Sequence, residues 1–429
     1  MSNTVHPLTE RKYYTLFIFV TSIFLMWGVG LTMMDVLNKH FQTVLGISKS
    51  RSALIQLSTF GAYTVVALPV GNFLRKYGYK KAILLGLLLY AAGSFLFIPA
   101  ANSASFAYFL IALFVLASGM ASLETVAHPL IASLGHQNTS DQRINLAQSF
   151  NGLGGVIGPI IGSYFLLNIE TRQAGNLETV QNLYITIGAL MTIMAAVFAF
   201  TPLSRQAMHL HTKEEVFSSG DKKEASNKLW HQKHFVFAVV AQFFNVAAQA
   251  GTWAYFINYG HEVMHFTAEK AGYFFSLSIF LLVIGRFFGT YLMRYIAPFK
   301  LLAVFSLCNI AMCILVSQGA GWLSYGALLM INFFFSIMYP TIFSLGLKDL
   351  GKRTHQASSY IVMGFLGGAI FPPLMGIIAD KDLAASYYLP IVCYIVIFLF
   401  GFRYPLLNKN LRAKNYRPFI LQPRKSTGA

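Results

Sequence analysis

The chain has 429 residues, of which 56% are hydrophobic and only 11% charged, and its net charge is +17. A soluble domain carries about 25% charged residues, so this composition excludes a water-soluble globular protein and predicts one whose outer wall meets lipid. The apolar runs are too long and alternate too little for barrel strands, and the basic residues lie in short loops and the tail rather than in one stripe, which excludes nucleic-acid binding.

Twelve apolar stretches follow one another along the chain, and each is long enough to cross a membrane as a helix. We expect these helices over residues 13–38, 52–74, 81–100, 106–134, 144–168, 179–202, 234–258, 268–293, 300–318, 322–346, 357–379 and 385–404. The long polar stretch between the sixth and seventh helices reads as a linker. The predicted organisation is an N-terminal six-helix half, a cytoplasmic linker, a C-terminal six-helix half and a cytoplasmic tail, at 1–202, 203–233, 234–404 and 405–429.

The charge pattern of the loops predicts the orientation. Residues 1–12 are polar, and the apolar run that follows is long enough to span, so we expect it to remain as an anchor rather than to be cleaved. Lys and Arg are concentrated in the loops that share a side with both termini, which is typical of cytoplasmic loops. We therefore expect a multi-pass protein of the cell membrane, a bacterial inner membrane, with both termini in the cytoplasm.

The sequence carries no pattern typical of a metal site, a nucleotide site or a catalytic pair. Its three cysteines, Cys308, Cys313 and Cys393, all lie in apolar segments without CxxC or Cys/His metal spacing, and we expect them to be small core residues. The chain also has no GxxxxGK[ST] loop for phosphate. We therefore expect neither a cofactor nor an enzyme.

Three short segments of the first half recur in the second half, in the same order and at nearly the same separation. The pairs are Pro129–Gly135 with Pro340–Gly346, Leu153–Pro159 with Leu366–Pro372, and Gly71–Tyr77 with Gly289–Tyr295. An even number of spans separates the members of each pair, so the halves should run parallel, as in transporters that bind their substrate near the midplane. The predicted fold class is an all-α membrane protein with twelve transmembrane helices in two parallel six-helix repeats.

Two acidic residues lie at membrane depth, where charged side chains are costly and usually functional. Asp35 is in the first span and Glu124 is in the fourth. Each is either paired with a basic or amide group of another helix or acts in proton coupling. Burial favours the neutral form of a carboxyl, which can cross the membrane field without net charge. A carboxyl that titrates in this way can also form a hydrogen bond with a sugar hydroxyl.

Amide and aromatic side chains gather in spans 1, 5, 7 and 10, several of them on a shared helix face. The set is Trp27, Thr32, Gln148, Asn151, Asn245, Gln249, Trp253 and Tyr339. Such residues often only hold helices together. So many neutral amides, with a Trp ring beside them, also suit a polyol, because a sugar offers hydroxyls for amides and a ring face for Trp.

Glycines are concentrated in spans 5 and 11. Gly154, Gly155 and Gly158 lie in span 5, and Gly367 and Gly368 lie in span 11. Because glycine has no side chain, these positions predict close approach of a neighbouring helix.

Several segments are similar to one known family. They are Leu123-Glu124-Thr125, Asn145–Asn151, Ala241–Phe243, Gly285–Phe287 and Tyr339–Gly346. With these segments the chain resembles the L-fucose–proton and hexose symporters of the major facilitator superfamily, from span 1 to span 12 but not in the linker and tails. The resemblance implies the two-half fold of that superfamily.

The resemblance also implies roles for particular residues. The family's proton-coupling carboxyls fall on Asp35 and Glu124, and its span 4 carboxyl also faces sugar, with Gln148 and Asn151 nearby. The chain departs from the family at two places. Gly30–Met34 stands where the family has an Asn-rich stretch, and His128 stands where it has Asn. We therefore count His128 among the substrate-binding candidates, because an imidazole in place of an amide changes which sugar hydroxyls can be bound.

These observations predict a proton-coupled symporter that imports a monosaccharide, L-fucose or a related hexose, by alternating access. We expect it to act as a monomer in the lipid bilayer, with the sugar and the proton as its partners and without nucleic acid. A sodium-coupled glucose/galactose or N-acetylglucosamine transporter remains an alternative. A membrane sugar sensor without transport is another, although the linker and tail are too short for a soluble output domain.

Overall fold

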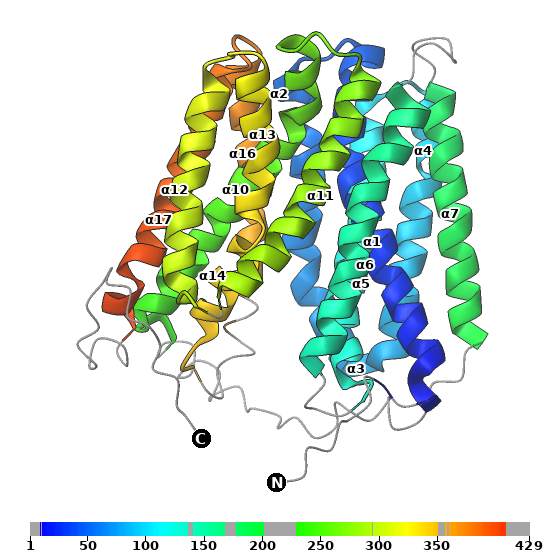
Figure 1. Cartoon of the computed structure of the whole chain (residues 1–429). Coiled ribbons are helices and arrows are strands. Elements are labelled where there is room, and N and C mark those ends of the chain that lie inside the picture. The colour runs from blue at the N-terminus through cyan, green and yellow to red at the C-terminus, as the bar shows by residue number, and fades with distance from the viewer. Residues whose placement is uncertain are drawn as a thin grey trace. The chain divides into compact units, whose positions relative to one another are not determined.

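The computed structural model describes residues 9, 11–135, 140–167, 177–200, 229–293, 295–350, 357 and 360–408. Most of the predicted linker and tail lies outside them. Within them the chain forms helices and turns, with no strand, and twelve helical segments are long and apolar enough to cross a membrane (Figure 1). The predicted all-α fold with twelve spans is confirmed. The segments are Arg11–Leu45, Lys49–Leu74, Lys76–Asn102, Phe106–His128, Leu146–Leu167, Leu177–Phe200, Lys233–Glu262, Ala268–Leu292, Pro298–Ser317, Trp322–Leu347, Tyr360–Ala379 and Ala385–Leu407.

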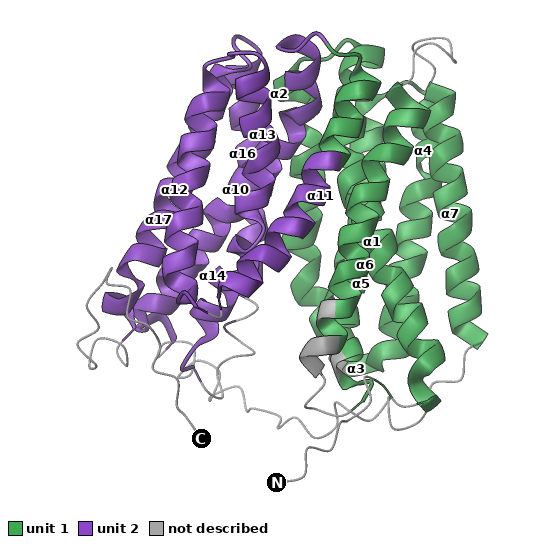
Figure 2. Ribbon diagram, in the orientation of Figure 1, with its two compact units in different colours: residues 1–215, 266–276 green, residues 216–265, 277–429 purple. Residues whose placement is uncertain are grey.

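The chain divides into two compact units (Figure 2). Unit 1 comprises residues 1–215 and 266–276. In it α1 packs against α6, and α3 packs against α5 and α7. Its elements are η1 (Arg11–Tyr13), α1 (Tyr14–Leu45), α2 (Lys49–Ser52), α3 (Leu54–Phe95), α4 (Phe97–Asn102), α5 (Phe106–Ser133), α6 (Ser140–Gly162), the π-helix η3 (Ser163–Leu167) and α7 (Leu177–Phe200).

Unit 2 comprises residues 216–265 and 277–429. In it α10 packs against α14, α16 and α17, and α12 packs against α13 and α17. Its elements are α10 (Lys233–Glu262), most of α11 (Ala268–Leu292), α12 (Pro298–Ser317), α13 (Trp322–Phe335), α14 (Met338–Leu347), η5 (Met363–Phe365), α16 (Leu366–Ala379), η6 (Ala385–Tyr387) and α17 (Tyr388–Leu407). The first residues of α11, up to Ser276, belong to unit 1, where the Ser276 hydroxyl donates to the Val156 carbonyl oxygen at 2.7 Å.

The helix α3 contains both the second and the third predicted spans. The two are separated at Gly78, whose φ of 78° and ψ of 174° are not helical. This backbone region is open essentially to glycine alone. A side chain at this position would therefore be strained even though no other atom lies within 4 Å of its Cβ site.

A glycine brings two helices into backbone contact in each unit. A Cβ on Gly154 of α6 would lie 2.1 Å from the carbonyl oxygen of Leu25 in α1. A Cβ on Gly367 of α16 would lie 2.0 Å from the carbonyl oxygen of Phe243 in α10. Neither distance leaves room for a methyl group, so both helix pairs depend on glycine. The two glycines hold the same place in one of the repeated segments, which agrees with the predicted relation between the halves.

The first helix is longer than predicted. We expected the span to end at residue 38, but α1 continues to Leu45 and ends at Gly46, which is left-handed with φ 59°. From the sequence we expected a polar loop to begin at Asn38, Lys39 and His40. They are instead buried within unit 1, so the helix extends through them.

The outward faces of the helices carry large apolar side chains. Ile18 is 68% exposed, Phe200 88% and Phe287 68%. A soluble protein rarely exposes extended apolar surface of this kind. Lipid around the helices would cover this apolar surface, so the exposure pattern agrees with a multi-pass membrane protein.

Candidate functional site

In unit 1 the imidazole of His128 connects two of the predicted site residues. Its Nδ1 lies 3.0 Å from the backbone carbonyl oxygen of Glu124, one turn earlier in α5, and must donate because a carbonyl only accepts. Its Nε2 therefore accepts, and the side-chain nitrogen of Gln148 in α6 lies 2.7 Å away as the donor. These two contacts select one neutral tautomer of His128 and orient the Gln148 amide.

Aromatic side chains of α1 pack around the same imidazole. The ring centroids of Phe24 and His128 are 4.9 Å apart, and those of Trp27 and His128 are 6.1 Å apart, both edge to face. The side-chain nitrogen of Asn151 in α6 donates to the Phe24 carbonyl oxygen at 3.2 Å. The structure thus brings Trp27, His128, Gln148 and Asn151 together, from α1, α5 and α6.

Sequence reasoning missed one member of this group, Tyr63 of α3. The indole nitrogen of Trp27 donates to the Tyr63 hydroxyl at 2.6 Å, which fixes the Trp27 ring. Tyr63 is 4% exposed. A hydroxyl-bearing ring in an otherwise apolar stretch of span 2 was the signal that could have identified it.

Glu124 lies one turn before His128 on α5 and is half-buried. Its carboxyl oxygen Oε2 is buried and has no hydrogen-bond partner in the described part of the chain. A buried polar atom normally has a partner, so an unpaired carboxyl oxygen next to the His128–Gln148 pair is available for a proton or a ligand hydroxyl.

Asp35 is more deeply buried, at 5% exposure, on α1. The side-chain nitrogen of Gln56 in α3 donates to its Oδ1 at 3.0 Å. Lys39, one turn later on α1, is also buried, but Gln56 is the hydrogen-bond partner of the Asp35 carboxyl among the described residues. An ionised carboxyl is costly in such a place without a cation, which makes Asp35 suited to carrying a proton.

Thr32 is placed apart from these groups. Its side chain is 2% exposed, and its hydroxyl donates to the Gly28 carbonyl oxygen of its own helix at 3.1 Å. It packs against Gly158 of α6, where a Cβ on the glycine would lie 2.2 Å from the Thr32 hydroxyl. In this structure Thr32 therefore contributes to the packing of α1 on α6.

In unit 2 Trp253 begins a chain of hydrogen bonds across three helices. Its indole nitrogen donates to Oδ1 of Asn332 in α13 at 2.9 Å, and Nδ2 of Asn332 donates to the Ser278 hydroxyl of α11 at 2.9 Å. Sequence reasoning missed Asn332 and Ser278. Asn332 is a single amide in an apolar run and Ser278 is one of two serines in another, and only the fold brings them to Trp253.

The other predicted residues of unit 2 lie on α10 and α14. Asn245 is fully buried, and neither polar atom of its amide has a partner among the described residues; the same holds for Gln242, one turn earlier. Gln249 is half-buried on the same helix. Tyr339 of α14 stacks on Phe343, with centroids 6.4 Å apart. Unpaired buried amides need partners, and ligand hydroxyls can supply them.

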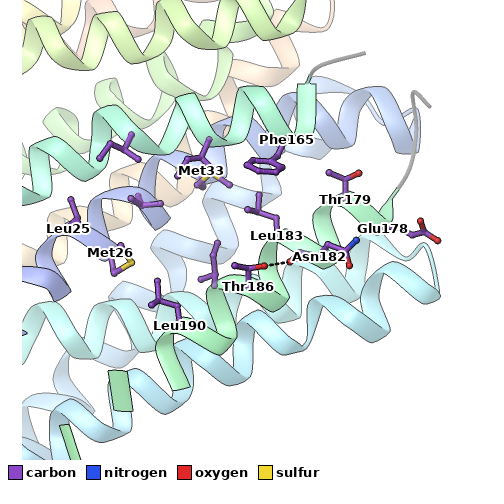
Figure 3. A pocket seen from close by; sticks show the side chains of 14 residues that line it. Leu25, Met26, Met33, Phe165, Glu178, Thr179, Asn182, Leu183, Thr186 and Leu190 are labelled. Carbon is purple, nitrogen blue, oxygen red and sulfur yellow. Dashed lines mark hydrogen bonds between the residues drawn. The ribbon is translucent and has the colours of Figure 1, made fainter. Parts of the chain in front are cut away.

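A cavity of about 760 Å³ also lies in unit 1, between α1, α6 and α7 (Figure 3). Its lining is mostly apolar, as at Leu25, Met26 and Met33, and Glu178 and Asn182 lie at one end. It contains none of the predicted site residues, so we place the candidate site at the polar groups above. Within the described residues no group of three or more His, Cys, Asp or Glu side chains could hold a metal ion.

Comparisons with known proteins agree with this picture. The chain is 34% identical over 414 residues to the L-fucose-proton symporter of Escherichia coli (strain K12), covering 91% of this chain and 93% of the relative. It is 33% identical over 407 residues to the glucose/galactose transporter of Brucella abortus biovar 1 (strain 9-941), covering 93% and 97%. The crystal structure of the transporter FucP in the outward conformation matches with a TM-score of 0.68 and 33% identity, over 93% of this chain and 100% of that one.

These relatives are transporters rather than enzymes, and they match the chain over nearly its whole length. Residues 16–372 also match the sequence model of the Major Facilitator Superfamily. The twelve spans, the two units and the corresponding glycine contacts are those expected for such a carrier. The chain belongs to the Major Facilitator Superfamily.

Proposed function

We propose that the chain is a proton-coupled symporter that imports a monosaccharide, L-fucose or a related hexose, by alternating access. The observation that carries the proposal is the unpaired, buried carboxyl oxygen of Glu124, one turn from the His128–Gln148 hydrogen bond. A proton-linked sugar carrier needs a carboxyl that can change protonation beside groups that hold hydroxyls. The names of the relatives, an L-fucose-proton symporter and a glucose/galactose transporter, support the same substrate class.

In this proposal Asp35 and Glu124 carry the coupling proton. One or both carboxylates gain a proton on the outer side, which neutralises the carboxyl, and lose the same proton on the inner side. A bound ligand shifts the balance between outward and inward states only by binding some states better than others. The proton does this by removing a buried charge, and the sugar does it by contacting Glu124 when that side chain is neutral.

Sugar recognition is assigned to polar and aromatic side chains of both units. Trp27 offers a ring face, and its orientation is held by Tyr63. Amides offer both a donor and an acceptor to neighbouring sugar hydroxyls. The proposed substrate-binding residues are Glu124, Gln148, Asn151, Trp27, His128, Asn245, Gln249, Trp253 and Tyr339. Thr32 is left out of this set because its hydroxyl donates within α1.

We further propose that the protein is a monomer in a bacterial inner membrane, with both termini in the cytoplasm. Its halves would comprise residues 1–202 and 234–404, joined by a cytoplasmic linker at 203–233 and followed by a tail at 405–429. The excess of Lys and Arg in the loops on the side of both termini supports this orientation.

The test is sugar-induced alkalinisation of the medium around energy-depleted cells that express the chain. L-fucose, D-glucose, D-galactose and N-acetylglucosamine are added one at a time, and alkalinisation with one of them identifies the sugar and the coupling ion together. Uptake that requires sodium and moves no proton would replace the proposal with the sodium-coupled alternative. Binding of a sugar without uptake would indicate a sensor.

A pair of variants tests the role of Glu124. Glu124→Gln removes the titratable proton, so sugar accumulation and proton uptake should both be lost, while exchange of labelled for unlabelled sugar continues. Glu178→Gln makes the same chemical change at an exposed carboxyl of α7 and should leave both intact. Unchanged accumulation and proton uptake in Glu124→Gln would show that this carboxyl has no part in coupling.

A further inference from the structure

The amide of Gln56 holds the Asp35 carboxyl inside unit 1. Gln56 lies near the beginning of α3 and is 1% exposed. Its Nε2 donates to Oδ1 of Asp35 at 3.0 Å. A donor of this kind stabilises a carboxylate more than it stabilises a neutral carboxyl, because hydrogen bonds to charged groups are stronger.

The other half of the same amide is unused. Oε1 of Gln56 is buried and has no partner among the described residues. Thr59, three residues later and on the same face of α3, is fully buried, and its hydroxyl likewise has no partner there. Unsatisfied buried groups of this kind are unusual, since buried polar atoms are nearly always paired. The unpaired Oε1 of Gln56 is explained if the structure shows one of two hydrogen-bond arrangements of its amide.

Gln56 is the one hydrogen-bond partner of the Asp35 carboxyl among the described residues, and two nearby cationic or titratable side chains have contacts elsewhere. His40 is bonded at Nδ1 to the Leu166 carbonyl oxygen at 2.8 Å, and Arg51 lies over the Phe106 ring at 6.0 Å. Arg143 of α6 is far along the helix, since Gly162 of α6 already packs beside Val36, about five turns away. Other charged or titratable side chains on α1, and on α2 and α5, which pack against α1 and α3, are Lys39, His40, Lys49, Arg51, Glu124 and His128.

We propose that Gln56 is a positioning residue for the coupling proton and serves Asp35 in both protonation states. When Asp35 is a carboxylate, the Gln56 N–H donates to it, as the structure shows. When Asp35 gains its proton, the amide turns about its last bond and Oε1 accepts the new O–H. Gln56 itself neither gains nor loses a proton. The inference rests on the proposed role of Asp35 in proton coupling.

The test compares Gln56→Met with the wild type in proteoliposomes, measuring sugar uptake and proton uptake as a function of pH. Met keeps the length of the side chain and removes both the donor and the acceptor. Without the donor, the ionised form of Asp35 loses more stabilisation than the neutral form does, so Asp35 binds its proton more tightly. The alkaline midpoint of uptake should rise by about one pH unit, which is about tenfold in proton affinity.

The matched control is Gln42→Met. Gln42 is a partly buried amide two turns after Asp35 on α1, and it donates to the Ser52 hydroxyl at 2.8 Å and to Asn38 at 3.2 Å. Its substitution should lower stability without moving the midpoint. A second variant, Gln56→Glu, keeps the shape and puts a second carboxyl beside the first, so the midpoint should rise further.

Three results would overturn the inference. The first is a midpoint that is equal in wild type, Gln56→Met and Gln56→Glu. The second is an equal shift in the Gln42→Met control. The third is a shift that persists in Asp35→Asn, where a contact acting through Asp35 should be silent. If the wild type moves sugar without any proton, the proposed function fails first and this inference falls with it.

Discussion

Substituting Gly154 by Ala tests the helix contact that supports the candidate site. The added Cβ would lie 2.1 Å from the Leu25 carbonyl oxygen and 3.0 Å from the Val29 nitrogen. Ordinary contact begins at 3.4 Å, so α6 must retreat from α1 by about 1.3 Å at this point. Backbone atoms of a packed helix cannot turn away as a flexible side chain can.

The expected loss of stability is the difference between two opposing contributions. Overpacking of a tight interior costs about 1–3 kcal/mol. Alanine in place of glycine favours the helix by about 0.8–1.0 kcal/mol. Because the added methyl group meets backbone atoms, the upper end of the overpacking range applies, and the net loss is about 2 kcal/mol. This loss lowers the melting temperature by about 4–8 °C for a unit of roughly 200 residues. Sugar uptake should fall as well, because Asn151, one turn from Gly154, bonds to α1 at Phe24.

The assay is thermal unfolding of purified protein in detergent, together with uptake in cells. Gly61→Ala is the control, because Gly61 lies in α3 and its Cβ site has no atom within 4 Å. This control should be as stable as the wild type or slightly more stable. Equal melting temperatures for Gly154→Ala and Gly61→Ala would refute the argument that α1 and α6 are in backbone contact.

Three further substitutions have outcomes set by single hydrogen bonds. Tyr63→Phe removes the hydroxyl that accepts from Trp27 and orients its ring. In uptake kinetics the KM for sugar should rise about fivefold, the equivalent of about 1 kcal/mol, with kcat nearly unchanged. An unchanged KM would mean that the Trp27 indole does not need this hydrogen bond. Thr32→Val keeps the shape of a side chain whose hydroxyl serves only its own helix, so uptake should stay within about twofold, whereas a large loss would return Thr32 to the sugar site. Trp253→Phe removes the indole N–H that donates to Oδ1 of Asn332 and should lower the melting temperature in a thermal scan. An unchanged melting temperature would contradict the hydrogen-bond chain of unit 2.

The spans could be predicted from the sequence because each apolar run is about as long as a bilayer is thick. Their ends were less predictable where polar residues are buried rather than exposed. The stretch from Asn38 to Gln42 has the composition of a loop, yet Gln42 donates to Ser52 and the helix continues to Leu45. Hydropathy measures how a residue partitions into lipid and does not register partners that another helix supplies.

The candidate site could be predicted only in part, for the same reason. Asp35 and Glu124 stand out in sequence because an acid in an apolar span is rare. Their surroundings come from other helices, where Gln56 and Tyr63 are ordinary polar residues with no distinguishing pattern. Thr32 was predicted as one of the polar side chains of span 1 that follow Trp27, but its hydroxyl is bonded within α1. Which side chains of a helix face one another is decided by packing.

The glycine contact between α1 and α6 has a consequence for how the binding groups move. A backbone-to-backbone contact contains no rotamers that can rearrange, so the two helices should travel as one rigid body through the transport cycle. Trp27 on α1 and Asn151 on α6 would then keep their separation whichever side of the membrane is open. The sugar would meet the same spacing of ring and amide on entry and on exit, and differences in affinity between the two sides would then come from protonation or from the binding groups of unit 2.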